Sequence, residues 1–225
     1  MPRIARLCAL GYPHHITQRG NNKQTVFFDN QDRKFYIKTL KKYCERYALD
    51  LWAYCLMNNH VHLLVVPRKE ESLARAIGGT DLVYTQYINR KYKRSGRLWQ
   101  NRFFSCVIEQ EGYLLGVMRY IEKNPVRSKI VKKAEEYQWS SAGFHLAMKN
   151  DMLLSDKKYP FEISTYQKFF ADTNENMDAQ IRKSTSVGRV LGKEKFVQHL
   201  ENLLKRRITP KKPGRHRLPL RNGKA

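Results

Sequence analysis

Residues 58–66 read Asn-Asn-His-Val-His-Leu-Leu-Val-Val, so two histidines separated by one residue begin an otherwise apolar run. The run is typical of a buried strand, and it ends at Pro67. The apolar and aromatic stretch Leu49–Met57 precedes it, and the two asparagines in between predict a tight turn, because asparagine tolerates the left-handed backbone region. The sequence therefore predicts a β-hairpin whose second strand starts with His60 and His62.

The sequence around this hairpin predicts a sheet with two further strands and with helices between the strands. Apolar periodicity and turn signals place strands over residues 12–19 and 103–110, and helices over residues 32–48, 72–92 and 111–123. Gly78-Gly79 is a candidate break in the second helix, and Asn124-Pro125 is expected to end the third. This order is that of an α+β fold with a ferredoxin-like or RRM-like split βαβ antiparallel sheet. The helices are expected on one face, which leaves the other face free for a ligand.

Changes in composition along the chain predict three segments: a folded domain over residues 1–148, a linker with a short helix over 149–180, and a basic extension over 181–225. Residues 182–225 hold 14 Lys and Arg against Glu194 and Glu201, which is +12 of the total +23. In this extension an amphipathic helix is expected on the apolar stripe Phe196, Val197, Leu200, Leu203 and Leu204. The stretch after it is rich in Pro, Gly and charge, which predicts a flexible basic tail.

The net charge favours a polyanionic partner. The 225 residues include 43 Lys and Arg against 20 Asp and Glu, which gives a net charge of +23 and a pI near 10.0. Each Lys or Arg that neutralises a phosphate releases a condensed counterion, so nucleic acid is the favoured partner. An anionic membrane surface is the competing interpretation. The hydrophobic content of 41% is sufficient for a packed core.

No feature of the sequence predicts secretion or insertion into a membrane. The N-terminal apolar patch is too short for a signal peptide, and no apolar run is long enough to span a bilayer. The cysteines are widely scattered without a CxxC spacing, which is typical of reduced thiols: Cys8, Cys44, Cys55 and Cys106. We therefore expect a cytoplasmic, nucleoid-associated protein.

Two pairs of residues are candidates for chemistry. Side chains on a strand alternate between faces, so His60 and His62 point the same way, about 7 Å apart. Two such imidazoles can bind a divalent cation if a third ligand approaches, and hydrogen-bonded core histidines are the alternative. Tyr120 and Asn124 are neighbours on one face of the last helix. A phenol is a candidate nucleophile and an amide oxygen a candidate ligand, while a core tyrosine and a helix C-cap are the plainer interpretations.

Cations mixed with aromatic rings follow the second helix, a combination that holds unstacked bases and phosphates. The candidate nucleic-acid contacts in this stretch are Arg94, Arg97, Trp99 and Arg102, next to Phe103. The alternative is that the two rings belong to the core. Further candidates for phosphate binding are Arg127 and, in the basic tail, Lys211, Lys212, Arg215 and Arg217.

Three motifs in this order resemble one known family: YPHHITQRGNN over residues 12–22, MNNHVHLLVVP over residues 57–67 and YIEKNPVR over residues 120–127. They are similar to the single-tyrosine transposases of the HUH endonuclease superfamily, and more narrowly to the REP-associated tyrosine transposases. The resemblance spans residues 1–145 and includes the stretches LWQNRF and WSSA. Residues 181–196 also resemble a downstream extension found in some members.

The resemblance implies a metal-dependent enzyme that cuts and joins single-stranded DNA near hairpins through a 5′-phosphotyrosine. Residues 1–148 would form the catalytic domain, and Tyr120 matches the nucleophile of the family. The resemblance also implies a Mg²⁺ or Mn²⁺ ion with the ligands His60, His62 and Asn124.

An early strand motif of the family implies DNA or phosphate contacts at His15, Thr17 and Arg19. A catalytically silent protein that binds DNA hairpins is the alternative function. An RNA-binding module of similar topology is disfavoured, because no RNP1-like run is present on the expected strands. The chain is expected to act as a monomer or a homodimer. The sequence leaves open whether Tyr120 completes its own site or a partner's.

Overall fold

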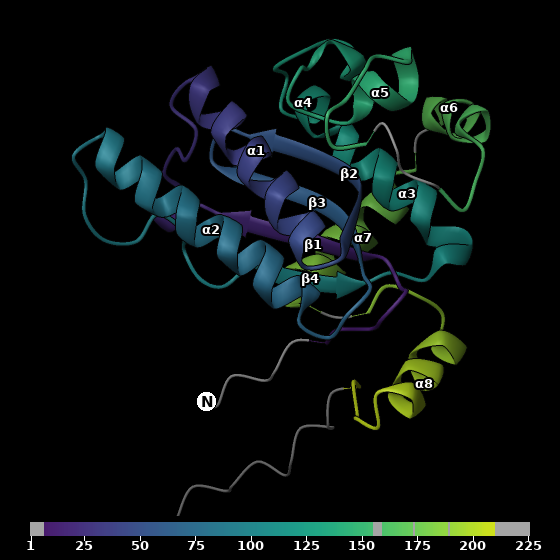
Figure 1. Cartoon of the computed structure of the whole chain (residues 1–225). Helices are drawn as coiled ribbons and strands as arrows, with labels where there is room; N and C mark the ends of the chain where they lie inside the picture. Colours follow the sequence, from purple (N-terminus) through teal and green to yellow (C-terminus); the bar gives the residue numbers. More distant parts are fainter. Residues whose placement is uncertain (1–6, 155–158, 173, 189, 210–225) are drawn as a thin grey trace, which may run out of the picture.

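The computed structural model describes residues 7–154, 159–172, 174–188 and 190–209 of the 225-residue chain. Within these residues one sheet is formed by four strands: β1 (His14–Arg19), β2 (Leu49–Met57), β3 (His60–Pro67) and β4 (Phe104–Val107). The strand order is β2-β3-β1-β4, and each neighbouring pair is antiparallel (Figure 1). This order confirms the predicted ferredoxin-like split βαβ sheet, with β1 and β3 at its centre.

The described residues also contain eight α-helices: α1 (Asn30–Arg46), α2 (Ser72–Lys91), α3 (Gln110–Glu122), α4 (Asn124–Arg127), α5 (Ala142–Ala147), α6 (Ile163–Ala171), α7 (Glu175–Val187) and α8 (Glu194–Leu203). The three helices predicted from periodicity correspond to α1, α2 and α3, with ends that differ by at most two residues. None of the helices in the described ranges combines the length and the apolarity that a membrane crossing requires.

Helices α1 and α2 cover one face of the sheet (Figure 1). Val61, Leu63 and Val65 of β3 point into this core, as the alternation of side chains along the strand predicts. The expected break at Gly78-Gly79 is absent, since α2 is continuous from Ser72 to Lys91. A Cβ atom at Gly79 would collide with the ring of Tyr43, so this glycine instead allows α2 to pack closely against α1.

Helices α3 and α7 cover most of the other face, so the expectation of a free face holds only at one end of the sheet. Leu64 of β3 packs there with Val117 of α3 and Ile181 of α7. A Cβ atom at Gly116 would collide with Met177, which shows how closely these two helices approach each other. The second face is apolar over much of its length, and burying that surface stabilises the fold. Within the part of the chain that the structure describes, a pocket opens on this face at the end where β3 begins.

The segment after α5 is more structured than the expected linker. Helix α6 lies inside it, and the expected boundary between residues 180 and 181 falls within α7, which packs against α3 and β4. Helix α7 therefore belongs to the same folded unit as the sheet.

Helix α8 confirms the predicted amphipathic helix of the extension. Phe196 and Leu200 pack against Ala9 and Val107, whereas Leu203 of the predicted apolar stripe is exposed. The basic tail lies outside the described residues beyond residue 209, together with Lys211, Lys212, Arg215 and Arg217.

The β2–β3 hairpin is confirmed, but the reason predicted for its turn is wrong. Asn58 and Asn59 form the two-residue loop, yet neither has a positive φ. Their side chains are bound to other segments instead: Oδ1 of Asn58 accepts from Nη2 of Arg33 at 2.5 Å, and Nδ2 of Asn59 donates to the carbonyl of Lys23 at 3.1 Å. Tertiary hydrogen bonds therefore hold this turn, and with it the position at which the two histidines begin.

Candidate active site

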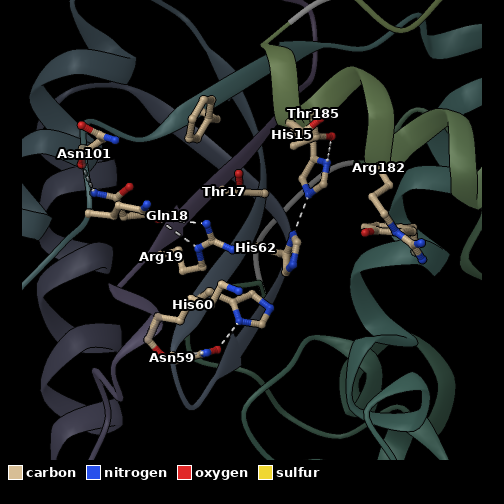
Figure 2. Close-up of a pocket in the computed structure, with 15 residues that line it drawn as sticks. His15, Thr17, Gln18, Arg19, Asn59, His60, His62, Asn101, Arg182 and Thr185 are labelled. Atoms are coloured by element: carbon tan, nitrogen blue, oxygen red, sulfur yellow. Dashed lines mark hydrogen bonds between the residues drawn. The ribbon is translucent and has the colours of Figure 1, made fainter. Parts of the chain in front are cut away.

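A pocket of about 390 Å³ opens at the end of the sheet where β1 ends and β3 begins (Figure 2). Strands β1, β3 and β4, the loop before β4, and helices α3 and α7 form its walls. Six residues predicted from the sequence meet here: His15, Thr17, Arg19, His60, His62 and Tyr120. The other residues that line the pocket are Gln18, Lys23, Asn59, Gln100, Asn101, Phe104, Arg182, Thr185 and Ser186. The described lining thus includes three cations and no carboxylate.

Strand β3 places His60 and His62 on the same face, with ring centroids 5.0 Å apart. One nitrogen of each ring is already bound: Nδ1 of His60 lies 2.6 Å from Oδ1 of Asn59, and Nδ1 of His62 lies 2.9 Å from Nε2 of His15. The Nε2 atom of each ring has no hydrogen-bond partner among the described residues. Each ring therefore keeps one nitrogen available for a ligand in the pocket.

His15 of β1 is fully buried beside this pair, which contradicts the expected contact between its side chain and DNA. Its Nε2 atom faces His62, and its Nδ1 atom lies 2.8 Å from Oγ1 of Thr185 on α7 (Figure 2). The rings of His15 and His62 stack, with centroids 5.1 Å apart. Because both ring nitrogens are occupied, His15 supports His62 rather than binding a ligand.

Burial lowers the pKa of each of these imidazoles. Burial first, and then the charge of Arg127, lower the pKa of His15 to about 3. Burial and the charge of Arg19 lower the pKa of His60 to about 4. The pKa of His62 lies well below its ordinary value, mainly because of burial and then because of its two histidine neighbours. All three rings are therefore neutral at pH 7, which is the form that binds a metal.

Tyr120 of α3 projects into the same pocket. Its ring centroid lies 5.9 Å from those of His15 and His62, in an edge-to-face arrangement in both cases. The guanidinium of Arg127 lies 4.0 Å from the centre of the tyrosine ring, donates to the carbonyl of Tyr120 at 2.8 Å and pairs with Asp178 at 3.0 Å. Arg127 therefore holds the tyrosine ring, and its other contacts occupy the guanidinium that was expected to contact phosphate.

Asn124 is not among the residues that line the pocket. It lies one turn after Tyr120, but its Nδ2 atom donates to the carbonyls of Tyr120 and Ile121 at 3.0 and 3.1 Å. The structure thus shows the helix-capping role that the sequence left open. Among the described residues, no three His, Cys, Asp or Glu side chains are grouped so that they could hold a metal. The Nε2 atoms of His60 and His62 are the imidazole nitrogens that the described lining leaves open to a ligand.

The predicted DNA contacts before β4 fall into two groups. The prediction for Trp99 is wrong, because its ring is buried in the α1–α2 core and its Nε1 atom donates to the carbonyl of Asp81 at 3.3 Å. Arg97 and Arg102 are exposed, and Arg94 is half-buried and donates to Gln24 at 2.7 Å, so cations remain at the surface outside the pocket. The apolar surroundings of the indole, rather than DNA, explain the tryptophan.

Helix α7 contributes three lining residues that sequence reasoning missed: Arg182, Thr185 and Ser186. The basic run that starts at Arg182 was the only local signal, and it predicted a separate extension. Strand alternation could have placed Thr17 beside the histidines, since it pairs with His62 across the sheet. Nothing in the sequence near Thr185 indicates that it contacts a histidine 170 residues earlier.

A split βαβ sheet with paired histidines on β3 and a tyrosine on α3 fits the class of the tyrosine transposases, which are enzymes. The family described as "Transposase IS200 like" matches residues 9–124, slightly more than half of the chain. The chain therefore belongs to the IS200-like transposase family.

Two known proteins are similar to this chain, one in sequence and one in fold. A Haemophilus influenzae protein whose name describes it as a REP-associated tyrosine transposase is 28% identical over 138 residues, which cover 56% of this chain and 74% of the relative. A solved structure of a REP-associated tyrosine transposase bound to a REP hairpin superimposes with a TM-score of 0.55 at 17% identity. It covers 72% of this chain and 96% of the other, so the shared fold extends beyond the stretch that matches the family.

Proposed function

We propose that this transposase is a metal-dependent single-stranded DNA endonuclease and strand transferase that cuts and joins DNA near hairpins through a 5′-phosphotyrosine on Tyr120. The observation that carries the proposal is the tyrosine ring 5.9 Å from the ring of His62, in a pocket whose described lining holds three cations and no carboxylate. A phosphodiester is the anionic substrate that such a pocket fits. The solved relative is described as bound to a REP hairpin, which supports hairpin DNA as the substrate.

The chemistry proposed for Tyr120 is an in-line displacement at phosphorus. The tyrosine oxygen forms a bond to the phosphorus and loses its proton to solvent, while the bond from phosphorus to the 3′ oxygen breaks and that oxygen takes up a proton. The 3′-OH of a second strand reverses the step, so strands are joined without an external energy source. The guanidinium of Arg127 against the ring keeps the nucleophile in place.

The residues present fit a divalent cation. His60 and His62 are neutral and each presents an unshared nitrogen, and we propose that Asn124 joins them as the third ligand after turning away from the helix carbonyls. Mg²⁺ or Mn²⁺ is the proposed ion, and imidazole ligands favour Mn²⁺. When bound, the cation supplies Lewis-acid charge that stabilises the oxygens of the phosphate under attack.

We propose that the single-stranded DNA reaches the pocket along the basic side chains that surround it. Arg19 donates to Gln100 at 3.0 and 3.1 Å, and it lies at the end of β1 next to the histidines. Lys23 and Arg182 line the same pocket from other segments. Thr17 adds a hydroxyl on the face that carries His15 and His62. These groups suit phosphate oxygens, while the surface cations Arg94, Arg97 and Arg102 would extend the contact.

The test is a covalent adduct assay. The full chain is incubated with labelled hairpins that carry single-stranded flanks, in the presence of Mn²⁺, and the products are resolved on a denaturing gel. Wild type is expected to form an adduct, and Tyr120→Phe is expected to form none while still binding the hairpin. Tyr113→Phe is the matched control, because Tyr113 lies on the same helix outside the pocket.

An adduct that survives Tyr120→Phe would refute the assigned nucleophile. Binding without an adduct across a library of hairpins would favour the alternative function, a catalytically silent hairpin-binding protein.

A further inference from the structure

Helix α7 lies outside the stretch that matches the family, yet a chain of hydrogen bonds connects it to His62. The hydroxyl of Thr185 donates to the carbonyl of Ile181 at 2.8 Å within α7. Oγ1 of Thr185 also lies 2.8 Å from Nδ1 of His15, and Nε2 of His15 lies 2.9 Å from Nδ1 of His62 (Figure 2). The side chains of Thr185, His15 and His62, which form this series of hydrogen bonds, are all buried.

The direction of each hydrogen bond follows from the one before it. A threonine hydroxyl has one proton, and here that proton is given to Ile181, so Oγ1 can only accept from His15. The proton of the neutral His15 ring is therefore on Nδ1, and its Nε2 atom must accept from His62. The proton of His62 is then on Nδ1, which leaves the lone pair of its Nε2 atom facing the pocket.

A separate contact, to Asn59, fixes the tautomer of His60 in the same way. Nδ2 of Asn59 donates to the carbonyl of Lys23 at 3.1 Å, which identifies Oδ1 as the atom 2.6 Å from Nδ1 of His60. An amide oxygen can only accept, so His60 is also protonated on Nδ1. Two separate networks, one from the hairpin turn and one from α7, thus direct both unprotonated Nε2 atoms into the same pocket.

We propose that Thr185 is a positioning residue of the active site: through His15 it holds His62 in the tautomer whose Nε2 atom can bind a metal. The role as metal ligand rests on the proposed function, whereas the tautomer is a property of the protein alone. Hydrogen-bond partners behind metal-binding histidines fix the tautomer and typically change metal affinity roughly 10- to 100-fold when they are removed. Helix α7 is accordingly part of the catalytic unit.

Thr185→Val tests the proposal because it keeps the shape of the side chain and removes the acceptor. Without an acceptor for its Nδ1 proton, His15 is expected to move the proton to Nε2, which drives the proton of His62 to its own Nε2 atom. Thr185→Ser restores the hydroxyl. Thr80→Val is the matched control, since Thr80 is buried in α2 with the same type of hydrogen bond, to Ala76 at 2.8 Å, far from the pocket.

The readouts are the ring tautomers, from long-range ¹H–¹⁵N spectra of the full chain at pH 7.5, and Mn²⁺ affinity, from the electron paramagnetic resonance signal of the free ion. Wild type, Thr185→Ser and Thr80→Val are expected to keep the proton of His62 on Nδ1. Thr185→Val is expected to shift it to Nε2 in a large fraction of molecules and to weaken Mn²⁺ binding roughly tenfold.

A wild-type His62 protonated on Nε2 would overturn the proposal, and so would a Thr185→Val chain with an unchanged tautomer. Where the wild type binds Mn²⁺, a Thr185→Val chain with unchanged Mn²⁺ affinity would overturn it as well. A wild-type chain that has the expected tautomer but binds no Mn²⁺ would support the orienting role of Thr185 and would instead overturn the metal dependence in the proposed function.

Discussion

Helix α3 contacts two buried hydrogen-bond networks that each contain histidine. One network ends at the pocket, and the other connects helices to one another. On one side Tyr120 faces His15 and His62 at the pocket. On the other side Glu122, two residues later in the same helix, binds His145 of α5. The exposed fraction is 7% for His62 and 0% for His145, so burial alone does not distinguish the functional network from the structural one.

The His145 network has a partner for every nitrogen and carboxylate oxygen. Oε1 of Glu122 accepts from Nδ1 of His145 at 2.6 Å and from the hydroxyl of Ser141, while Oε2 accepts from Tyr166 at 2.8 Å. Nε2 of His145 lies 3.0 Å from the hydroxyl of Tyr159. This network connects α3 to α5 and α6 and leaves no atom for a ligand.

The His62 network contains no carboxylate among the described residues and ends in an unshared nitrogen at a pocket. That open atom, rather than burial or the pairing of histidines, is what separates a site that can bind a ligand from one that only holds helices together. The comparison predicts that changes on one side of α3 impair chemistry and that changes on the other side impair stability.

His62→Ala is expected to cause the largest effect, a loss of cleavage of roughly a thousandfold or more, because it removes a ligand of the ion proposed to stabilise charge on the phosphate. Hairpin affinity should change less than about threefold, since the cations around the pocket remain. Cleavage rates and a binding titration measure the two effects. His145→Gln is the matched change on the other side of α3, and a comparable loss of cleavage there would remove the distinction between the networks.

Glu122→Gln is expected to lower the free energy of unfolding by about 3 kcal/mol, because an amide nitrogen would face hydroxyl and imidazole donors in a buried site. Urea denaturation measures this change. The folded fraction should still form the tyrosine adduct at the wild-type rate. Glu111→Gln, at an exposed position of the same helix, should change the free energy by less than about 0.5 kcal/mol. A variant as stable as wild type would show that the carboxylate is not needed to hold α3.

The order of helices and strands along the chain could be read from the sequence because it rests on local signals: alternation in β3, periodicity in α1, and a two-residue turn between apolar runs. The environment of the histidines could not, because it depends on contacts between distant segments. Thr185 lies 170 residues after the histidine it contacts, and Trp99 is buried by α1 and α2 rather than by its sequence neighbours. The capping bonds of Asn124 also depend on a side-chain rotamer that spacing does not determine.

His14 is a buried histidine without a carboxylate partner among the described residues, so we expect it to lower the free energy of unfolding in acid. Its Nε2 atom lies 3.2 Å from the backbone nitrogen and 3.3 Å from the carbonyl oxygen of Ala9, and its Nδ1 atom lies 2.9 Å from Oγ of Ser105. Burial lowers its pKa to about 4. The unfolded chain takes up this proton near pH 6.5, so stability is complete above that value and falls as the pH decreases toward 4. Between pH 7.5 and pH 5 this one group should cost about 2 kcal/mol.

Urea denaturation of wild type and His14→Gln at several pH values isolates that contribution. The variant should lose less stability than wild type between pH 7.5 and pH 5, whereas His199→Gln, at an exposed histidine of α8, should behave as wild type. Identical pH dependence in wild type and His14→Gln would contradict the argument from burial.

Asn124 donates to the carbonyls of Tyr120 and Ile121 at the end of α3, and it is also the proposed third metal ligand. If it joins His60 and His62 as proposed, Asn124→Ala should weaken Mn²⁺ binding roughly tenfold when hairpin DNA is present, and much less in its absence, because the side chain is engaged with helix carbonyls in the free protein. Stability should fall by about 1 kcal/mol in either case, through the lost hydrogen bonds. Mn²⁺ titrations with and without DNA separate the two roles. Equal affinities for wild type and variant under both conditions would assign Asn124 to the helix alone and leave a metal held by two histidines and the phosphate itself.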